Sequence, residues 1–234
     1  MSKLKICLPV MGLLLLVGMF AHADQVIYDN GAPNQQNGNE MTEWFQSETF
    51  TIAQNASITS WTFWDLELPN SGYQGSFFWW IAGVDVNGNP DFNGGIAHGE
   101  SGGALVQRVQ VNGGQCNILG EFCEFMDTIE PAGGPLNAPA GTYTLLLHNG
   151  NIHFNQRSEF YWETTNPNAT APGLECDLQI FGDDCFKVGG DYSSNGQEHA
   201  FFITGNLVGV PEPGTLMLMG TGLLGAITGL RRRF

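Results

Sequence analysis

The central part of this chain has very few basic residues. The whole sequence carries eight Lys and Arg residues against 23 Asp and Glu, but five of the eight basic residues lie in the first 23 or the last four positions. Residues 24–205 keep only Arg108, Arg157 and Lys187 against 22 acidic residues (all but Glu212), a formal balance of −19. A surface this acidic repels phosphate backbones, which excludes nucleic acid as a partner. It is compatible with solubility outside the cell and with binding of divalent cations.

Residues 24–205 also lack an apolar period of 3.6 sustained over three helical turns, which excludes a helical core. Short segments rich in β-branched and aromatic residues are instead separated by clusters of Gly, Asn, Pro and Asp, as at 30–34 and 131–135. Many short strands with frequent turns predict an all-β domain with two packed sheets, and we expect a jelly-roll-like β-sandwich. The segments expected to form strands are 44–52, 57–68, 76–83, 104–111, 142–148, 159–163 and 198–206.

Catalytic motifs are missing as well. No histidine after residue 23 stands at a ligand spacing such as H-E-x-x-H, so a catalytic zinc is not indicated. Residues 99–103 satisfy G-x-S-x-G, but a nucleophile elbow needs a helix after Ser101, and an alternating strand follows. Asp65 and Glu67 share one strand face, whereas glycosidase carboxylates face each other across a cleft about 5–10 Å wide. We therefore expect a protein that is not an enzyme, with an extracellular hydrolase as an alternative.

The first 23 residues have the features of a secretory signal peptide. Two lysines precede an apolar run over residues 6–20, which ends in Ala21-His22-Ala23. This A-x-A exit predicts cleavage after Ala23, with Asp24 as the new N-terminus. The alternative is an uncleaved anchor helix, but the run is short and no cationic flank follows it.

The C-terminus combines a proline motif, an apolar segment and a cationic end. Pro211, Glu212 and Pro213 precede about 16 uncharged residues at 215–230, and Arg231, Arg232 and Arg233 follow. A transmembrane helix needs about 20 apolar residues, and arginines that snorkel into the head groups make up part of the difference. The positive-inside rule places the arginines in the cytoplasm and everything before Pro211 outside, in agreement with the signal peptide.

This order of parts resembles the PEP-CTERM sorting tail. The resemblance covers residues 210–234 and implies that the tail is held in the inner membrane of a Gram-negative bacterium and processed by an exosortase. The protein then goes to the cell surface or to an exopolysaccharide matrix. By position, Pro211, Glu212 and Pro213 would be the recognition motif, and Arg231, Arg232 and Arg233 the retention charges. The alternative is a single-span anchor that stays uncut.

The expected organisation is therefore a signal peptide at 1–23, a β-sandwich at 24–205, a short linker at 206–209 and the sorting tail at 210–234, with its transmembrane helix at 215–230. Within the domain, the segments 78–81, 87–90, 96–101, 139–145 and 200–205 resemble sandwich domains often found ahead of such tails. This second resemblance implies no defined activity.

Four cysteines remain after the signal peptide with Cys7 is removed. An even number in an oxidising compartment predicts two disulfides. Three pairings are possible, and we prefer the sequence-local one, Cys116–Cys123 with Cys176–Cys185, which closes two short loops. A zinc site is the alternative, but separations of 7 and 9 residues match no common zinc knuckle.

Calcium is the one cofactor considered. Jelly-roll modules commonly bind structural Ca²⁺ where the first and last strands meet, and Asp29, Asn30 and Asp191 could supply oxygen ligands there. The alternative is that these are ordinary loop residues. The polar run at 85–91 departs from the EF-hand pattern and predicts a hairpin, with Asn87-Gly88 as a type I′ turn.

Tryptophan is plentiful, with six in the chain, and flat aromatic faces can stack on sugar rings. Trp61 and Trp64 point to opposite faces of one expected strand, as do Trp79 and Trp80, so at least one of each pair should be in the core. Our leading hypothesis is an exported, non-enzymatic surface or matrix protein that adheres to extracellular polysaccharide. A carbohydrate-binding module with a definite ligand and a permanently membrane-bound protein are further alternatives.

Overall fold

The computed structural model describes residues 24–69, 72–167, 172–187 and 189–208. Residues 24–207 form one compact unit. The expected signal helix, the sorting motif, the arginine cluster and the expected transmembrane helix lie outside the described residues. Within the described ranges, no helix is long and apolar enough to cross a membrane; the only helices there are single 3₁₀ turns, η2 (Gly103–Leu105), η3 (Asn112–Gly114) and η4 (Gly182–Phe186).

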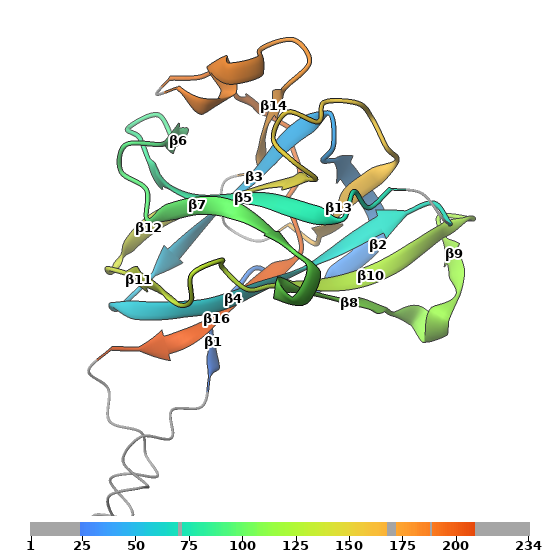
Figure 1. Cartoon of the computed structure of the whole chain (residues 1–234), viewed down its shortest axis with the longest axis horizontal. Helices are drawn as coiled ribbons and strands as arrows, with labels where there is room; N and C mark the ends of the chain where they lie inside the picture. The colour runs from blue at the N-terminus through green and yellow to red at the C-terminus, as the bar shows by residue number, and fades with distance from the viewer. Residues whose placement is uncertain (1–23, 70–71, 168–171, 188, 209–234) are drawn as a thin grey trace, which may run out of the picture. The chain divides into compact units, whose positions relative to one another are not determined.

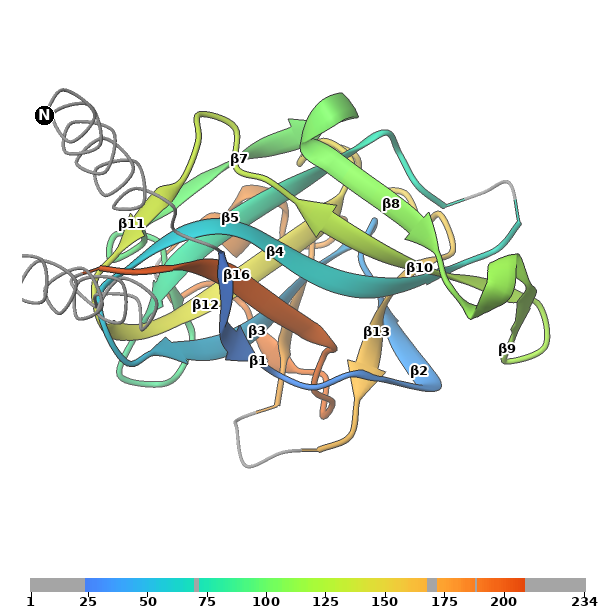
Figure 2. The same cartoon turned by 90° about the horizontal axis from the view of Figure 1, so that it is seen from below.

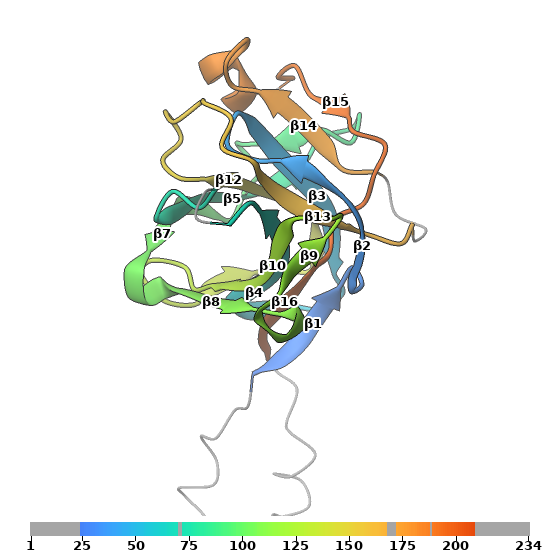
Figure 3. The ribbon, with the colours of Figure 1, turned by 90° about the vertical axis from the view of Figure 1, so that its right-hand side faces the viewer.

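The domain is all-β, as predicted, and its strands form two antiparallel sheets, here called the nine-stranded and the seven-stranded sheet. Figure 3 shows them as two stacked layers, with β3, β5 and β12 in one and β4, β8 and β10 in the other. The nine-stranded sheet contains β1 (Gln25–Asp29), β2 (Pro33–Glu40), β4 (Ala56–Glu67), β8 (Val106–Gln110), β9 (Cys116–Ile118), β10 (Phe122–Ile129), β11 (Leu136–Ala138), β13 (Phe160–Thr165) and β16 (Phe201–Leu207). The seven-stranded sheet contains β3 (Trp44–Ile52), β5 (Ser76–Val84), β6 (Pro90–Asp91), β7 (Ala97–Gly102), β12 (Gly141–Asn149), β14 (Leu174–Asp177) and β15 (Ser193–Ser194).

The chain passes repeatedly from one sheet to the other, as expected of a jelly-roll-like sandwich (Figure 1). It crosses between β3 and β4, again between β4 and β5, and again between β12 and β13. The long strand β4 organises the nine-stranded sheet, because it pairs with both β16 and β10 (Figure 2). Strand β16 ends at Leu207 and so includes the first two residues of the expected linker.

Large aromatic residues fill the space between the sheets. Trp61 on β4 and Trp79 on β5 are buried, and their rings meet edge to face with centroids 4.9 Å apart. Trp64 and Trp80 point the other way and are only partly buried, which confirms the prediction that one member of each pair lies in the core. Such aromatic contacts contribute about 0.5–1.5 kcal/mol each beyond the area that they bury.

Local structure corrects one turn prediction. Strands β5 and β6 form the expected hairpin, but the loop is not a type I′ turn at Asn87-Gly88. The Gly88 N–H donates to the Asp85 carbonyl oxygen at 3.1 Å, and only Gly88, at φ 89°, is left-handed. This is a type I turn followed by a glycine bulge. The Asp85 carboxylate selects it by accepting the N–H groups of Asn87 and Asn89.

The preferred disulfide pairing is confirmed. Cys116 is bonded to Cys123, which joins the neighbouring strands β9 and β10. Cys176 is bonded to Cys185, which ties strand β14 to η4.

Candidate functional site

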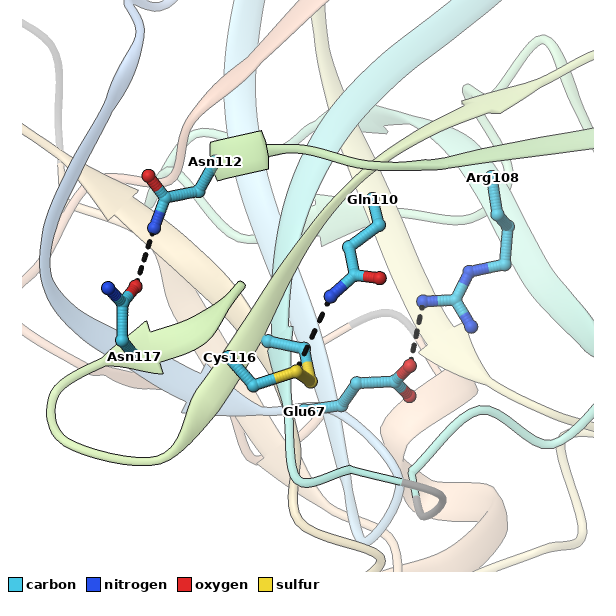
Figure 4. The surroundings of a disulfide bond; sticks show 7 residues. Glu67, Arg108, Gln110, Asn112, Cys116 and Asn117 are labelled. Atoms are coloured by element: carbon cyan, nitrogen blue, oxygen red, sulfur yellow. Dashed lines mark hydrogen bonds and ion pairs between the residues drawn. A yellow bond between two sulfur atoms is a disulfide. The ribbon is translucent and has the colours of Figure 1, made fainter. Parts of the chain in front are cut away.

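A buried charged cluster lies between the two sheets on the inner face of β4. Arg108 donates from Nε to Asp127 Oδ1 at 2.8 Å and from Nη2 to Asp65 Oδ2 at 3.1 Å. Its Nη2 also lies 3.5 Å from Glu67 Oε1 (Figure 4). The guanidinium packs over the rings of Tyr73 at 4.2 Å, Phe125 at 4.5 Å and Phe160 at 5.5 Å from their centroids. A single guanidinium thus contacts three carboxyl groups and is surrounded by aromatic rings. We call Arg108, Asp65, Glu67 and Asp127 the Arg108 cluster.

The two aspartates of the Arg108 cluster have raised pKa values. Both are fully buried, and burial is the main reason that the pKa of Asp65 lies well above its usual range and that of Asp127 is also raised. Asp127 adds to the rise at Asp65, whereas Arg108 opposes it in both. Like charges this close cannot both ionise easily. The guanidinium that contacts both carboxyl groups thus offsets only part of the effect of their burial on these two pKa values.

A second buried carboxyl pair lies on the other face of the nine-stranded sheet. Glu163 on β13 follows the core residue Trp162 and so points away from the core. Gln35, in a left-handed conformation at φ 56°, bridges the pair: its N–H donates to Glu163 Oε1 at 2.7 Å and its Nε2 to Glu124 Oε2 at 2.9 Å. Burial and the neighbouring Glu124 raise the pKa of Glu163 to about 8.

The Glu124–Glu163 pair predicts a pH-dependent stability. Because the pKa of Glu163 is raised from 4.5 to about 8, the protonated form is favoured in the folded state, so stability is full below about pH 4.5 and is lost as pH rises through about 8. Glu163→Gln copies the protonated carboxyl, and we expect this variant to be about 1–3 kcal/mol more stable than the native chain at pH 8 and equal to it near pH 4.5.

Urea unfolding between pH 4.5 and pH 8.5 checks this expectation. Glu121→Gln, which removes an exposed charge, is the control and should leave the shape of the profile unchanged. Parallel profiles for Glu163→Gln and the native chain would show that Glu163 is ionised across the whole range.

The residues that the sequence analysis weighed for catalysis, and did not assign to it, have structural partners. Ser101, the serine of the G-x-S-x-G run, is buried in β7. Its hydroxyl donates to the Glu130 carbonyl at 2.8 Å and accepts the Trp79 indole N–H at 3.0 Å. Asp65 and Glu67 do share a face, but that face is directed into the sandwich, where Arg108 and Tyr73 use their oxygens.

The three residues considered for calcium lie near the ends of the domain's sequence, and two of them have hydrogen bonds within it. Asn30 Oδ1 accepts the Tyr28 hydroxyl at 2.8 Å, and its Nδ2 donates to the His199 carbonyl at 2.9 Å. Asp29 caps the N–H of Gly31 at 2.8 Å, and Asp191 lies in the loop before β15. No three His, Cys, Asp or Glu side chains come together as a metal site within the described residues. The side-chain oxygen of Asn30 and one oxygen of Asp29 thus accept hydrogen bonds within the domain, and calcium at these three residues stays a prediction.

The outer face of the seven-stranded sheet carries a group of rings, which we call the aromatic face: the partly buried Phe78, Trp80, Phe92, Phe186 and Tyr192 and the exposed His98. Trp80 is at its centre, with its ring centroid 4.2 Å from His98 and 4.6 Å from Phe92. Phe186 of η4 lies almost parallel to Trp80, at 11° and 6.3 Å. The sequence indicated that Trp79 and Trp80 point to opposite faces but not which of them faces outward. The neighbouring rings come from β7, from the loop after β6 and from η4, and could not be placed from the sequence.

A shallow pocket adjoins the aromatic face where the loop after β12 meets η4. Ile152, His153 and Asn155 line one side, and Leu178, Asp183 and Phe186 the other. Its volume is about 110 Å³, too small to enclose a whole ligand, since enclosing sites measure about 300–1,000 Å³. We call it the η4 pocket.

The described residues define a strongly acidic, disulfide-bonded β-sandwich. Residues 209–233 match the family model of the PEP-CTERM protein-sorting motif. The match covers the tail alone, including Pro211, Glu212 and Pro213, and indicates an exported protein that is anchored transiently in the membrane of a Gram-negative bacterium and sorted by an exosortase. No curated protein matches the chain.

Proposed function

We propose that this chain is a non-enzymatic surface or matrix protein whose β-sandwich adheres to extracellular polysaccharide. The observation that carries the proposal is the aromatic face, a group of ring side chains that remains partly open on the outer side of a sheet. Apolar ring faces of this kind can stack on the C–H faces of sugars while water still reaches the sugar hydroxyls. The sorting tail supports the proposal, because such tails belong to exported proteins.

The absence of enzymatic activity is part of this proposal and has its own support. The hydroxyl of Ser101 and the carboxyl groups of Asp65 and Asp127 are buried and hydrogen-bonded within the sandwich. A catalytic group must reach a substrate atom within about 3 Å. These groups instead hold strands together.

Retention in the matrix tests the proposed adhesion. We expect Trp80→Ala to shift most of the processed protein from the polysaccharide matrix to the culture medium, because the central ring of the aromatic face is lost. Trp64→Ala is the matched control: Trp64 is also partly buried, but it lies on the nine-stranded sheet and packs on Phe202. Fractionation of cells expressing the full chain, with immunoblotting, gives the readout. Equal retention of both variants and the native chain would refute adhesion through this face.

Processing of the tail is a separate prediction. We expect the mature protein to end near Pro211 and to lack Arg231–Phe234, as mass spectrometry of its C-terminus would show. Glu212→Ala should leave the full tail in place and the protein in the membrane fraction. A mature native protein that still carries the three arginines would contradict processing and favour a permanent anchor.

A further inference from the structure

We infer that the η4 pocket binds one unit of a hexosamine polysaccharide with free amino groups. The inference rests on the proposed adhesion to polysaccharide and adds to it the place of the specific contact and the chemical class of the sugar. It depends on the shape of the pocket, on its charge and on its rigid support.

The lining of the η4 pocket has one apolar and one polar part. Ile152, Leu178 and Phe186 provide apolar surface, which suits the C–H face of a pyranose ring. His153, Asn155 and Asp183 are the exposed polar residues of the lining, and they could contact the substituents of the ring. A few polar groups around an apolar surface are the usual composition of a small-molecule site. At about 110 Å³, the pocket can take part of one sugar ring, while the polymer continues across the surface.

The charge of the pocket selects among sugars. Asp183 is exposed and lines the pocket, whereas the neighbouring Asp184 is paired with Lys187. Of the described residues in the lining, none is Lys or Arg, and the whole domain has a formal balance of −19 between residues 24 and 205. This field repels uronic acids and attracts ammonium groups. An amino sugar satisfies both the apolar surface and the carboxylate.

The pocket is built on a rigid support. The Cys176–Cys185 disulfide fixes both ends of the segment that contains Leu178 and Asp183. Within it, Asp177 Oδ1 accepts the N–H groups of Gln179 and Ile180 at 2.8 and 3.0 Å. The ring of Phe186 packs edge to face on the buried Phe45, with centroids 5.3 Å apart. A site held in this way loses little entropy on binding.

The neighbouring rings extend the pocket in one direction. Phe186 belongs to both the η4 pocket and the aromatic face, where it lies nearly parallel to Trp80. A polymer seated in the pocket can therefore continue over Trp80 and Phe92. This continuity favours a chain of sugars over a single free sugar as the occupant.

Binding of oligosaccharides of equal length to the purified full-length chain in detergent tests the inference. The probes are a β-linked glucosamine oligomer, its N-acetylated counterpart and a galacturonic acid oligomer, measured by calorimetry at low and at high salt. We expect the glucosamine oligomer to bind most tightly and the galacturonic acid oligomer not to bind. Some affinity for the glucosamine oligomer should persist at high salt, because ring packing is not screened.

Variants within one loop separate the site from general attraction to an acidic protein. Phe186→Ala should weaken glucosamine binding at least about fivefold, whereas Phe181→Ala, an exposed ring in the same loop but outside the pocket lining, should change little. Asp183→Asn should reduce the preference for the free amine over the N-acetyl form about two- to fivefold. Asp184→Asn, which removes the same charge one residue away, should not.

Each failure has its own meaning. Equal effects of Asp183→Asn and Asp184→Asn, or complete loss of binding at high salt, would overturn the η4 pocket as the site and leave adhesion through the aromatic face intact. Preference for the galacturonic acid oligomer would overturn the chemical class. No binding to any of the three probes by the native chain, together with matrix retention that is lost in Trp80→Ala, would also overturn the inference while the proposed function stands.

Discussion

Arg108→Met will destabilise the domain by about 3–5 kcal/mol at pH 8, the range typical of a buried ion pair that loses one partner. The substitution leaves Asp65, Asp127 and Glu67 in the same apolar surroundings without the cation that they share. It also removes the guanidinium from above the rings of Tyr73 and Phe125. Methionine fills much of the space of the arginine side chain but carries no charge to balance the three carboxyl groups.

The loss should depend on pH in a defined direction. Arg108 holds down the pKa of all three carboxyl groups, although burial raises each of them above its usual value. Without Arg108 these pKa values rise further, and a raised folded-state pKa gives stability that is full at acidic pH and is lost as pH increases. The deficit of the variant should therefore shrink by at least about 1 kcal/mol between pH 8 and pH 5.

Arg157→Met is the matched control for Arg108→Met. Arg157 is the other arginine of the domain, and its ion pair with Glu159 is exposed, with about half of each side chain accessible (55% and 42%). Exposed pairs contribute about 0–1 kcal/mol, so urea unfolding should show little change. A small, pH-independent cost for Arg108→Met would mean that the three carboxyl groups are satisfied without it. Adding Asp65→Asn and Asp127→Asn to Arg108→Met should restore part of the stability.

The strands that the sequence predicted are those in which apolar residues alternate. Strand β3 has the expected bounds, 44–52. Strand β5 differs from expectation by one residue at its end, and β4 and β12 differ by one residue at each end. In these strands the residues of the main core recur at every second position, for example Phe50 and Ile52 on β3 and Trp61 and Phe63 on β4. Burial of one face imposes a period of two, which can be read without knowing the partner strand.

Strand β10 was missed because its inner face is partly charged. Asp127 stands where a core strand usually has an apolar residue, so the alternation that marks a strand is broken. Its side chain is accommodated only because Arg108 lies directly opposite in the register of β8 and β10. Register between strands cannot be read from one sequence, and for this reason the Arg108 cluster could not be predicted.

Strand β2 was not predicted, for a different reason. It begins within the segment 30–34 that was expected to be a turn, and apart from Pro33 it contains only Asn, Gln, Gly and Glu. Hydrogen bonds from polar groups hold it to β13, among them Asn34 Nδ2 to the Thr165 carbonyl at 2.8 Å and the Gln35 N–H to Glu163. An edge strand that depends on such bonds has no hydrophobic pattern to reveal it.

The two disulfides, whose pairing was predicted correctly, should differ in their contribution to stability. Replacing Cys176 and Cys185 by alanine should cost about 3–5 kcal/mol, because closing a short loop is worth about 2–3 kcal/mol and removal of buried sulfurs adds a packing loss. Both cysteines are fully buried beside Phe45 and Leu146. Replacing Cys116 and Cys123 should cost only about 2 kcal/mol, because β9 and β10 already pair at these residues and Cys116 is partly exposed.

Urea unfolding of the two double variants measures this difference, and each variant is the control for the other. Amide hydrogen exchange should show which part of the domain is destabilised. In the native chain the N–H groups of Phe181, Gly182 and Asp184 donate to backbone carbonyls within the loop, and loss of the Cys176–Cys185 disulfide should speed their exchange. The same variant should lose binding at the η4 pocket while it stays folded below the unfolding transition. If the Cys116–Cys123 variant were the less stable of the two, or if exchange in η4 did not change, then packing of Phe186 on Phe45 would hold the loop without the covalent bond.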